Sequence, residues 1–426
     1  MTKAPGPPER TAGARIRRLT IDLTPLRVSR DFRLVWSGLL ITSAGSQFTL
    51  VAVFVQVAEL TDSAAAVGAT GLAYVAGLVA GSLAGGAVLD AWDRRRLLMF
   101  AQVGLAAGSA TLLGGALAGE PPLWLIYAGL AVLAASSAID GPTRSAMTTR
   151  LLGAPLMPAA QALNQVVWNT SALLGPAMAG LVVVRWGVTV AYVVDLVSIA
   201  CMFVAAAMVR PMPPIASDHN DTGLSAIREG FSFARRNRLI MSTFAIDLIA
   251  MIFGLPRALF PFLIVKQFHE SPEAIGLLFA APAVGALLGA LTSGWSGRVR
   301  RQGLAVILSV AAWGVAIIAF GFSGSSLWFG LTMLAVAGWA DVISAIFRTT
   351  ILQLAAPDRL LGRLFGIHIL VVTGGPRLGD VEAGLVASLV SPTFSVVSGG
   401  IACVVGAALV ALAYPELRRA RATDSS

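Results

Sequence analysis

Acidic residues interrupt the apolar stretches in the second half of this chain. They are Asp247, Asp341, Asp380 and Glu382. A carboxylate that moves between water and a closed apolar pocket can carry a proton, because burial disfavours its charged form. These four acids are therefore candidates for proton transfer. The alternative is a structural ion pair, such as Asp380 or Glu382 with Arg377 on adjacent helical turns.

Two further polar residues lie near these acids in the sequence. Arg257 shares an apolar run with Asp247 and is a candidate for the same chemistry or for substrate binding. His368 lies about three helical turns before Asp380. A histidine titrates near neutral pH, so His368 could relay a proton, but packing alone also explains a histidine near a helix start.

Tryptophan and amide side chains gather in an earlier apolar run. Trp168 lies close to Asn164, Gln165 and Asn169. Aromatic and amide groups of this kind could line a pocket for amphipathic, aromatic ligands. Packing between helices explains the same residues equally well, so both interpretations stay open.

The elements that carry these residues are expected to be membrane-spanning helices. Only 12% of the 426 residues are charged and 56% are hydrophobic, with a mean hydropathy of +0.79. A soluble chain, in contrast, is roughly a quarter charged. A spanning helix needs about 20 apolar residues and pairs all its backbone groups internally. We therefore predict an all-α polytopic membrane protein.

Twelve apolar runs predict twelve transmembrane helices in two pseudo-symmetric six-helix bundles. The runs lie at about 34–58, 66–89, 97–119, 123–143, 160–184, 188–209, 238–265, 273–295, 303–321, 327–350, 363–389 and 394–414. The predicted layout is a cytoplasmic tail (1–33), a bundle (34–210), a linker (211–237), a second bundle (238–414) and a cytoplasmic tail (415–426). Apolar and arginine residues alternate in the linker after its prolines, which predicts a short amphipathic helix on the membrane surface.

Basic residues fall between the apolar runs, which argues against a nucleic-acid partner despite the net charge of +9. Alternate loops are rich in arginine, whereas the opposite loops hold only Arg185 and Lys266. By the positive-inside rule both termini are cytoplasmic and the number of spans is even. Two charges are expected near the membrane edges, Asp195 towards the outer side beside Tyr192 and Arg348 at the cytoplasmic side.

The two halves of the chain repeat each other. A shift of 204 residues places Gly81 on Gly285, Arg144 on Arg348, and Gly175 on Gly379. Six spans in each half keep one orientation, so an axis along the membrane normal is expected to relate the halves. A binding site is then expected between them, near the middle of the membrane.

The loop after the second span combines a glycine, two acids and a basic cluster. Its residues are Gly86, Asp90, Asp93, Arg94, Arg95 and Arg96. The pattern resembles the cytoplasmic signature of the major facilitator superfamily, which implies a latch that holds the cytoplasmic side closed by charge pairing. A positive loop with incidental acids is the alternative. The second half lacks the acid, because Gly294 stands at the position that corresponds to Asp90.

The fifth predicted span contains Gly175, Pro176 and Gly180. This string resembles the glycine–proline motif of exporting members of the superfamily, in which small residues allow close helix packing and proline bends the helix. The eleventh span holds a related but more polar string from Gly374 to Gly384. Its three charges are expected to face a partner or a water-filled cavity, because lipid disfavours them.

Nearly the whole chain resembles the enterobactin-exporter-like branch of bacterial efflux proteins. The resemblance rests on strings at 31–38, 60–68 and 289–295, on the stretch from Gly338 to Arg363, and on the GGPRLGD string. It implies twelve helices, export from the cytoplasm and coupling to a proton gradient. Many proton antiporters have a mid-membrane arginine on the fourth span, whereas Arg144 lies near the cytoplasmic end of that predicted helix.

These features favour a secondary exporter in a bacterial plasma membrane, a monomer in lipid that uses protons to drive a siderophore or drug-like substrate. A proton-coupled nutrient importer and a non-transporting membrane sensor remain alternatives. A membrane-embedded enzyme is disfavoured, because His219, His269 and His368 are far apart in the sequence. The sequence contains neither a metal-ligand spacing nor a glycine-rich phosphate loop, so no metal and no cofactor are expected.

Overall fold

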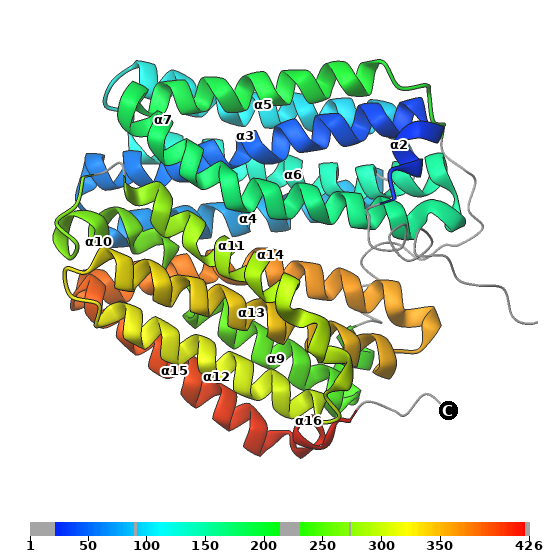
Figure 1. Cartoon of the computed structure of the whole chain (residues 1–426). Coiled ribbons are helices and arrows are strands. Elements are labelled where there is room, and N and C mark those ends of the chain that lie inside the picture. The colour runs from blue at the N-terminus through cyan, green and yellow to red at the C-terminus, as the bar shows by residue number, and fades with distance from the viewer. Residues whose placement is uncertain (1–21, 89–91, 214–230, 272–273, 422–426) are drawn as a thin grey trace, which may run out of the picture.

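The computed structural model describes residues 22–88, 92–213, 231–271 and 274–421, and every regular element within them is helical (Figure 1). The first half holds α2 (Thr24–Val28), α3 (Arg30–Thr61), α4 (Ala64–Val88), α5 (Arg94–Leu117), α6 (Leu123–Leu152), η1 (Ala154–Leu156) and α7 (Met157–Ala207). The second half holds α9 (Arg238–Phe253), η2 (Arg257–Leu259), α10 (Phe260–Lys266), α11 (Ile275–Thr292), η4 (Ser293–Arg298), α12 (Gln302–Gly321), α13 (Leu327–Ala355), α14 (Asp358–Leu389), α15 (Pro392–Ala413) and α16 (Pro415–Arg419).

Ten helical segments of the described chain are long and apolar enough to cross a membrane. One of them, Pro155–Ala207, has 53 residues, far more than the ~20 that one crossing needs. Gly187 breaks it into two crossings, because its backbone (φ 81°, ψ 169°) is outside the helical region. The 32-residue helix α14 is interrupted by charged side chains but has the length of a span. Counted this way, the described helices are consistent with the twelve predicted crossings, and the all-α polytopic fold class is confirmed.

Side-chain caps fix where five of the long helices begin. Ser29, Asp93, Asn237, Ser326 and Ser391 each accept a hydrogen bond from a backbone N–H in the first turn of the helix that follows. These groups satisfy N–H donors that have no partner within the helix. The first span therefore begins at residue 30, before the apolar run at 34 from which the sequence predicted it.

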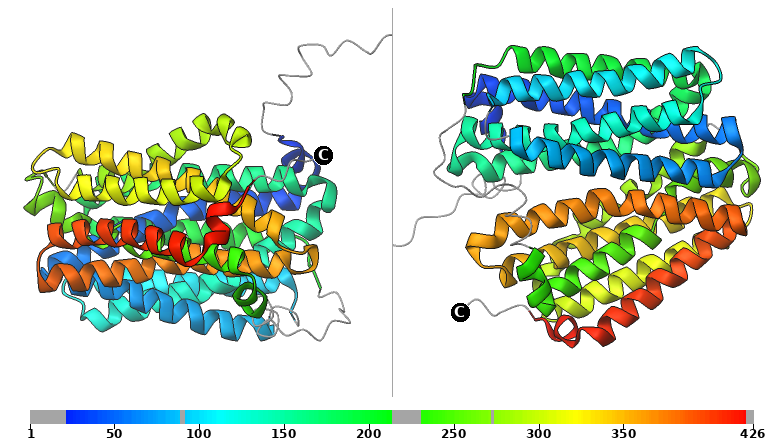
Figure 2. Two further views of the ribbon diagram at one scale, coloured as in Figure 1. Left: turned by 90° about the horizontal axis from the view of Figure 1, so that it is seen from below. Right: turned by 180° about the vertical axis from the view of Figure 1, so that it is seen from behind.

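The helices form two bundles that lie side by side (Figures 1 and 2). Helices α3 to α7 make the first bundle, in which α3 packs against α7 and α5 against α6. Helices α9 to α15 make the second, in which α12 packs against α13 and α15. The bundles meet along two helix pairs, α4 with α14 and α7 with α11. These pairs come from corresponding positions of the two halves, as the internal repeat predicts.

Glycines allow the two bundles to touch at one end of the molecule. A Cβ on Gly384 of α14 would lie 2.9 Å from the Cα of Gly68 on α4. A Cβ on Gly180 of α7 would lie 2.7 Å from the Cα of Gly276 on α11. Both distances are too short for any side chain, so only glycine permits this approach. An ion pair between Asp62 and Lys266 also joins the bundles at this end, which we call the paired end, with Nζ 2.9 Å from Oδ1.

At the opposite end, near α2 and α16, the ribbons of the two bundles diverge (Figure 1). The apolar clusters there each belong to one bundle. One cluster joins Val35, Leu98, Met147 and Met202 of the first bundle, and another joins Ile240, Leu352, Leu360 and Leu364 of the second. We call this the termini end. The bundles are thus packed together at the paired end and have separate cores at the termini end.

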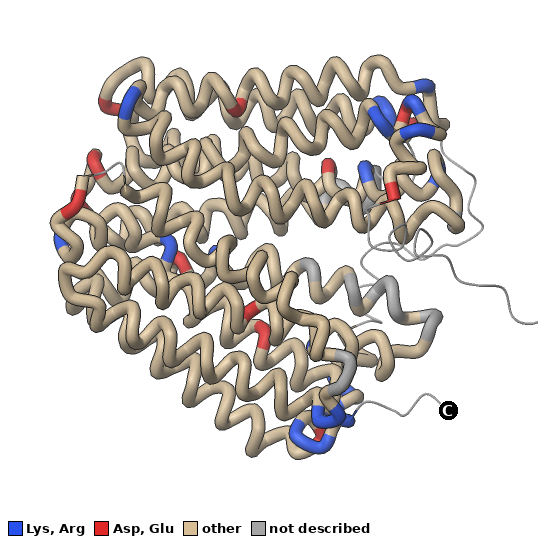
Figure 3. Tube along the Cα trace, viewed as in Figure 1, with Lys and Arg blue, Asp and Glu red and all other residues tan. Residues whose placement is uncertain are grey.

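Arginines gather at the termini end (Figure 3), where they hold chain segments against the bundles. Arg210 lies 3.2 Å from the buried carboxylate of Asp31. Arg150 donates to the carbonyl of Pro213, and Arg238 pairs with Glu416 at 2.9 Å. Most of the predicted amphipathic linker helix lies outside the described residues. The described contacts anchor the start of the linker to the first bundle and α16 to the second.

Candidate functional site

A buried group of charged side chains lies inside the second bundle. Arg348 Nη1 lies 2.7 Å from Asp247 Oδ1, and Arg348 Nη2 lies 3.6 Å from Asp341 Oδ1. His368 Nδ1 lies 3.4 Å from Asp247 Oδ2. We call these four residues the acid cluster. The side chain of Arg348, predicted near the cytoplasmic edge, is only 4% exposed and lies within the bundle.

Three helices bring the acid cluster together. Asp341 and Arg348 are seven residues apart on α13, so they lie two turns apart on one face of the helix. Asp247 comes from α9 and His368 from α14, both of which pack in the same bundle. The short contact between Arg348 and Asp247 is not aligned as a hydrogen bond, so the attraction is mainly electrostatic. The sequence could not show this, because periodicity gives a helix face but not the neighbouring helix.

The acid cluster contains two carboxylates but only one arginine, beside one histidine. Asp247 and Asp341 face one arginine, and His368 is the fourth member. Asp247 is 1% exposed, whereas the side chain of Asp341 is 33% exposed. One acid is therefore sealed in the bundle while the other reaches its surface. Such an arrangement can take up a proton at an accessible oxygen and redistribute the charge around Arg348.

The first bundle lacks this excess of acid. With the shift of 204 residues, the positions of Asp247, Asp341, Arg348 and His368 correspond to Ser43, Ser137, Arg144 and Asn164. Arg144 instead forms an ion pair with Asp140, one turn earlier on α6. Gln102 donates to the same carboxylate, with Nε2 2.7 Å from Oδ1. The first bundle thus pairs its arginine with one acid, and Asn164 occupies the histidine position.

A second charged group lies where α14 meets α4. Asp380 Oδ2 lies 3.7 Å from Arg257 Nη2 and 3.8 Å from Arg377 Nη1. We call Arg257, Arg377 and Asp380 the arginine cluster. The guanidinium carbon of Arg377 lies 4.3 Å from the ring centre of Tyr74, which belongs to the first bundle. The alternative pairing of Arg377 with Asp380 is therefore present in the structure, and Arg257 joins it.

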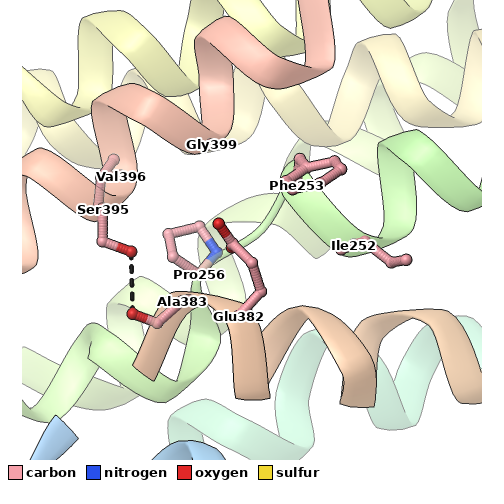
Figure 4. Close-up of a pocket in the computed structure, with 8 residues that line it drawn as sticks. All are labelled: Ile252, Phe253, Pro256, Glu382, Ala383, Ser395, Val396 and Gly399. Carbon is pink, nitrogen blue, oxygen red and sulfur yellow. Dashed lines mark hydrogen bonds between the residues drawn. The ribbon is translucent and has the colours of Figure 1, made fainter. Parts of the chain in front are cut away.

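Glu382 lies apart from both clusters. It lines a narrow crevice with Ile252, Phe253 and Pro256 near the end of α9, and with Val396 and Gly399 of α15 (Figure 4). Ser395 closes one side by donating to the carbonyl of Ala383 at 2.9 Å. Glu382 forms no ion pair with any residue that the structure describes. Of the four acids predicted from sequence, two share Arg348, one lies between two arginines, and one lies in this crevice.

The described parts of the predicted latch are attached to the first bundle. Asp93 caps α5 by accepting hydrogen bonds from the backbone N–H groups of Arg95 and Arg96. The Arg95 side chain donates to the carbonyl of Ala207, near the end of α7. Gly86 lies within α4, and Asp90 lies outside the described residues. The role of this loop as a latch stays a prediction.

The glycine–proline string of α7 packs on both sides. Gly175 faces Gln47 of α3, and Gly180 faces Gly276 of the other bundle. Pro176 is buried between them. In this region the small residues serve close packing, including the contact between the bundles.

Trp168 is not packed into the core, since 60% of its surface is exposed. Nearby on α7, Gln165 donates to Asn169 at 3.1 Å, and Asn164 is partly exposed. These groups are available to a ligand, but within the described chain no hydrogen bond or ion pair joins them to either cluster.

The first bundle contains a buried polar group that the sequence did not predict. Asp195 was expected near the outer interface, but it is only 3% exposed. Its Oδ2 accepts hydrogen bonds from Thr49 at 2.7 Å and from Ser109 at 2.9 Å. Tyr192, one turn away, donates to Gln56 at 2.7 Å. The signal that the sequence offered was the short spacing of Tyr192 and Asp195, which puts both on one helix face.

Comparison with known proteins identifies the family. A family model described as transmembrane secretion effector, MFS_3, matches residues 20–426. The enterobactin exporter EntS of Shigella boydii is 28% identical over 409 residues, which cover 95% of this chain and 96% of that protein. EntS of Citrobacter koseri is 28% identical over 407 residues, covering 94% and 96%.

Solved structures show the same fold. A bacterial homologue of the human lysosomal transporter Spinster, in an inward-facing and unoccupied conformation, superimposes with a TM-score of 0.73 at 14% identity. That comparison covers 91% of this chain and 98% of the other. A POT family transporter in complex with 5-aminolevulinic acid gives a TM-score of 0.71 at 11% identity, covering 90% and 96%. The chain is thus a multi-pass membrane transporter rather than an enzyme, and it belongs to the transmembrane secretion effector family of the major facilitator superfamily.

Proposed function

We propose that this protein exports small amphipathic molecules, of siderophore or drug-like type, across the cytoplasmic membrane of a bacterium in exchange for protons. The observation that carries the proposal is the acid cluster, in which Asp247 and Asp341 share one arginine and adjoin His368. The named relatives, which are enterobactin exporters, support export and make a siderophore a first substrate to test.

The arrangement of the bundles supports alternating access. The positive-inside rule puts the arginine-rich termini end at the cytoplasm, so the packed paired end faces outwards. In this state a substrate enters between the bundles from the cytoplasm. Rocking of one bundle against the other would open the paired end. In that opposite state the loop from Gly86 to Arg96, with Asp90 as its acid, would hold the cytoplasmic side closed.

The acid cluster supplies the coupling step in this proposal. A proton from outside binds Asp341 or His368, which are the more exposed members, and neutralises the excess negative charge. Arg348 then pairs with Asp247 alone. A bundle without an uncompensated charge crosses the closed intermediate more easily, because apolar surroundings disfavour an unpaired carboxylate.

Transport in proteoliposomes of known orientation tests the coupling. Uphill export driven by an imposed pH gradient is compared with downhill exchange of labelled substrate for unlabelled substrate. We expect Asp247→Asn, Asp341→Asn and His368→Gln to lose uphill export but to keep exchange, because exchange needs no net proton movement. Glu120→Gln is the control, since Glu120 is an exposed acid outside both clusters and outside the contacts between the bundles.

Unchanged uphill export in both Asp247→Asn and Asp341→Asn would show that the acid cluster does not couple transport to protons. Uptake in the opposite direction in oriented vesicles would identify an importer instead. The substrate itself is found by comparing small molecules retained in cells with and without the protein.

A further inference from the structure

The arginine cluster carries a surplus of positive charge at the contact between α4 and α14. Arg257 and Arg377 both face the carboxylate of Asp380, which has no exposed surface. Two guanidinium groups therefore share one acid. Glu382, two residues further along α14, lies in the crevice against Ile252 and Phe253 and does not balance the second arginine. Arginine stays charged in proteins, so the surplus persists.

The hydrogen-bonding capacity of this cluster is not used up. The distances from Asp380 Oδ2 to the two arginines, 3.7 and 3.8 Å, are longer than hydrogen bonds. Within the described chain, the Nε–H of Arg257 is buried without a hydrogen-bond partner. A guanidinium group is built to hold two oxygens of an acid in parallel. The donors that remain suit the oxygens of a bound anion.

The cluster also lies on the boundary between the bundles. Arg377 covers the ring of Tyr74 on α4 at 4.3 Å. A Cβ on Gly71 would meet the Asp380 side chain at 3.3 Å, so α4 and α14 are in close contact here. About a fifth of each arginine side chain is exposed, 21% for Arg257 and 19% for Arg377. Both arginine side chains therefore keep some exposed surface next to the boundary between the bundles.

We propose that Arg257 and Arg377 bind the ionised acidic group of the transported molecule, so that the substrates are amphipathic organic anions. The inference rests on the proposed export function and names its substrate class. Asp380 positions the two arginines and compensates part of their positive charge when no substrate is bound. Tyr74 lies against Arg377 from the other bundle, so that separation of α4 from α14 changes the site when access switches.

Binding to the purified full-length protein tests this inference without any transport. Equilibrium dialysis measures the affinity for 2-naphthoate and indole-3-acetate, each compared with its neutral primary amide. The acids should bind at least about tenfold more tightly than the amides, since charge-assisted bonds to arginine are roughly twice as strong as neutral ones. Arg257→Gln and Arg377→Gln should each remove most of this difference in affinity between acid and amide.

Asp380→Asn gives the sharpest contrast. It removes the competing carboxylate, so acid binding should become stronger by several-fold. Arg185→Gln is the control, because it removes one exposed arginine away from the cluster. Arg257→Lys and Arg377→Lys keep the charge but lose the paired donors, and they replace the glutamine variants if those do not fold.

Equal binding of acid and amide by the wild-type protein, or no binding of either acid, overturns the inference. So does a loss of acid binding in Asp380→Asn as large as in the arginine variants. The two proposals fail separately. Proton-driven export without acid selectivity removes only the anion site, and acid-selective binding without proton-driven export removes only the coupling.

Discussion

The buried carboxylates of the second bundle differ in how many arginines surround them. Asp247 and Asp341 share Arg348, whereas Asp380 lies between Arg257 and Arg377. Where acids outnumber the arginine, a proton can restore neutrality. Where arginines outnumber the acid, a bound anion can restore neutrality. We expect this ratio of acids to arginines to decide whether a carboxylate of the second bundle binds a proton or positions arginines.

Loss of Arg348 should destabilise the protein strongly. Arg348→Met leaves Asp247 buried without its counter-ion, and breaking a buried pair in this way costs about 3–5 kcal/mol. The double variant Arg348→Met, Asp247→Asn should recover much of that loss, because no bare charge remains. Thermal unfolding of the purified protein measures both.

The internal repeat provides a matched control for this substitution. Arg144 occupies the corresponding position, but its side chain is 21% exposed and pairs with Asp140. Arg144→Met should cost less than Arg348→Met, since Gln102 still donates a hydrogen bond to the buried carboxylate of Asp140. Equal destabilisation by the two methionine variants would contradict our account of the acid cluster.

Asp195 should contribute to folding rather than to coupling. Asp195→Leu leaves the hydroxyl groups of Thr49 and Ser109 buried without their acceptor, at a cost of about 1–3 kcal/mol. Asp195→Asn keeps an oxygen acceptor, so unfolding temperature and uphill export should both stay near wild type. Loss of uphill export in a stable Asp195→Asn variant would place a coupling acid in the first bundle.

At the scale of helices, apolar runs located the spans well and their interruptions poorly. The run at 303–321 agrees with α12, which covers Gln302–Gly321. The run at 238–265 is broken between α9 and η2, where Gly254 ends the helix and Pro256 precedes Arg257. Hydropathy stays high through this break because the intervening residues are also apolar. Only the Gly254–Pro256 pair signalled it, and this pair positions Arg257 at the arginine cluster.

The membership of the site was predicted less well than the helices. Charges within apolar runs identified Asp247, Asp341 and Asp380 as unusual residues, and the structure brings each of them to an arginine. Arg348 was placed at an edge because the apolar run ends near residue 350. In the structure α13 continues to Ala355, and a cluster that includes Leu352 and Leu364 buries that end. Packing between helices that are distant in the sequence buries Arg348, and a single sequence does not show that packing.

Larger side chains at the glycine contacts between the bundles should shift the protein towards the conformation in which the paired end is open. Gly384→Val pushes α14 from Gly68 on α4, and Gly180→Val pushes α7 from Gly276 on α11. Each should cost the present state about 1–3 kcal/mol by overpacking, whereas a state with the paired end open has no such contact. Gly114→Val is the control, because a Cβ there would meet nothing within 4 Å.

Distances between spin labels at Ser145→Cys on α6 and Leu354→Cys on α13 report this shift. Both positions are exposed and lie towards the termini end of their helices. Cys201 and Cys403 are first replaced by alanine, since they are the two native cysteines. The label distance should shorten in Gly384→Val and stay unchanged in Gly114→Val. An unchanged distance in both would show that the glycine contacts do not control access.

For the whole molecule, the two bundles share one layout but divide the chemistry unequally. The acid cluster belongs to the second bundle, while the corresponding positions of the first hold Ser43, Ser137 and Asn164. The arginine cluster also belongs to the second bundle and touches the first only through α4. The excess charge thus lies in the second bundle, whereas the first bundle pairs Arg144 with the single acid Asp140.

If this movement is required, a covalent bridge across the paired end should stop transport without preventing binding. Asp62 and Lys266 come from different bundles, and their charged atoms lie 2.9 Å apart. In a background without Cys201 and Cys403, Asp62→Cys with Lys266→Cys can be joined by a short thiol-specific cross-linker. The bridge holds the present state, so export and exchange should fall to background and return after reduction. Binding of 2-naphthoate from the termini end should persist, because that end is not cross-linked.

Each single variant treated with the same reagent should transport normally. Exchange that continues in fully bridged protein would mean that substrate crosses without opening of the paired end, and rocking of the bundles would then be the wrong description.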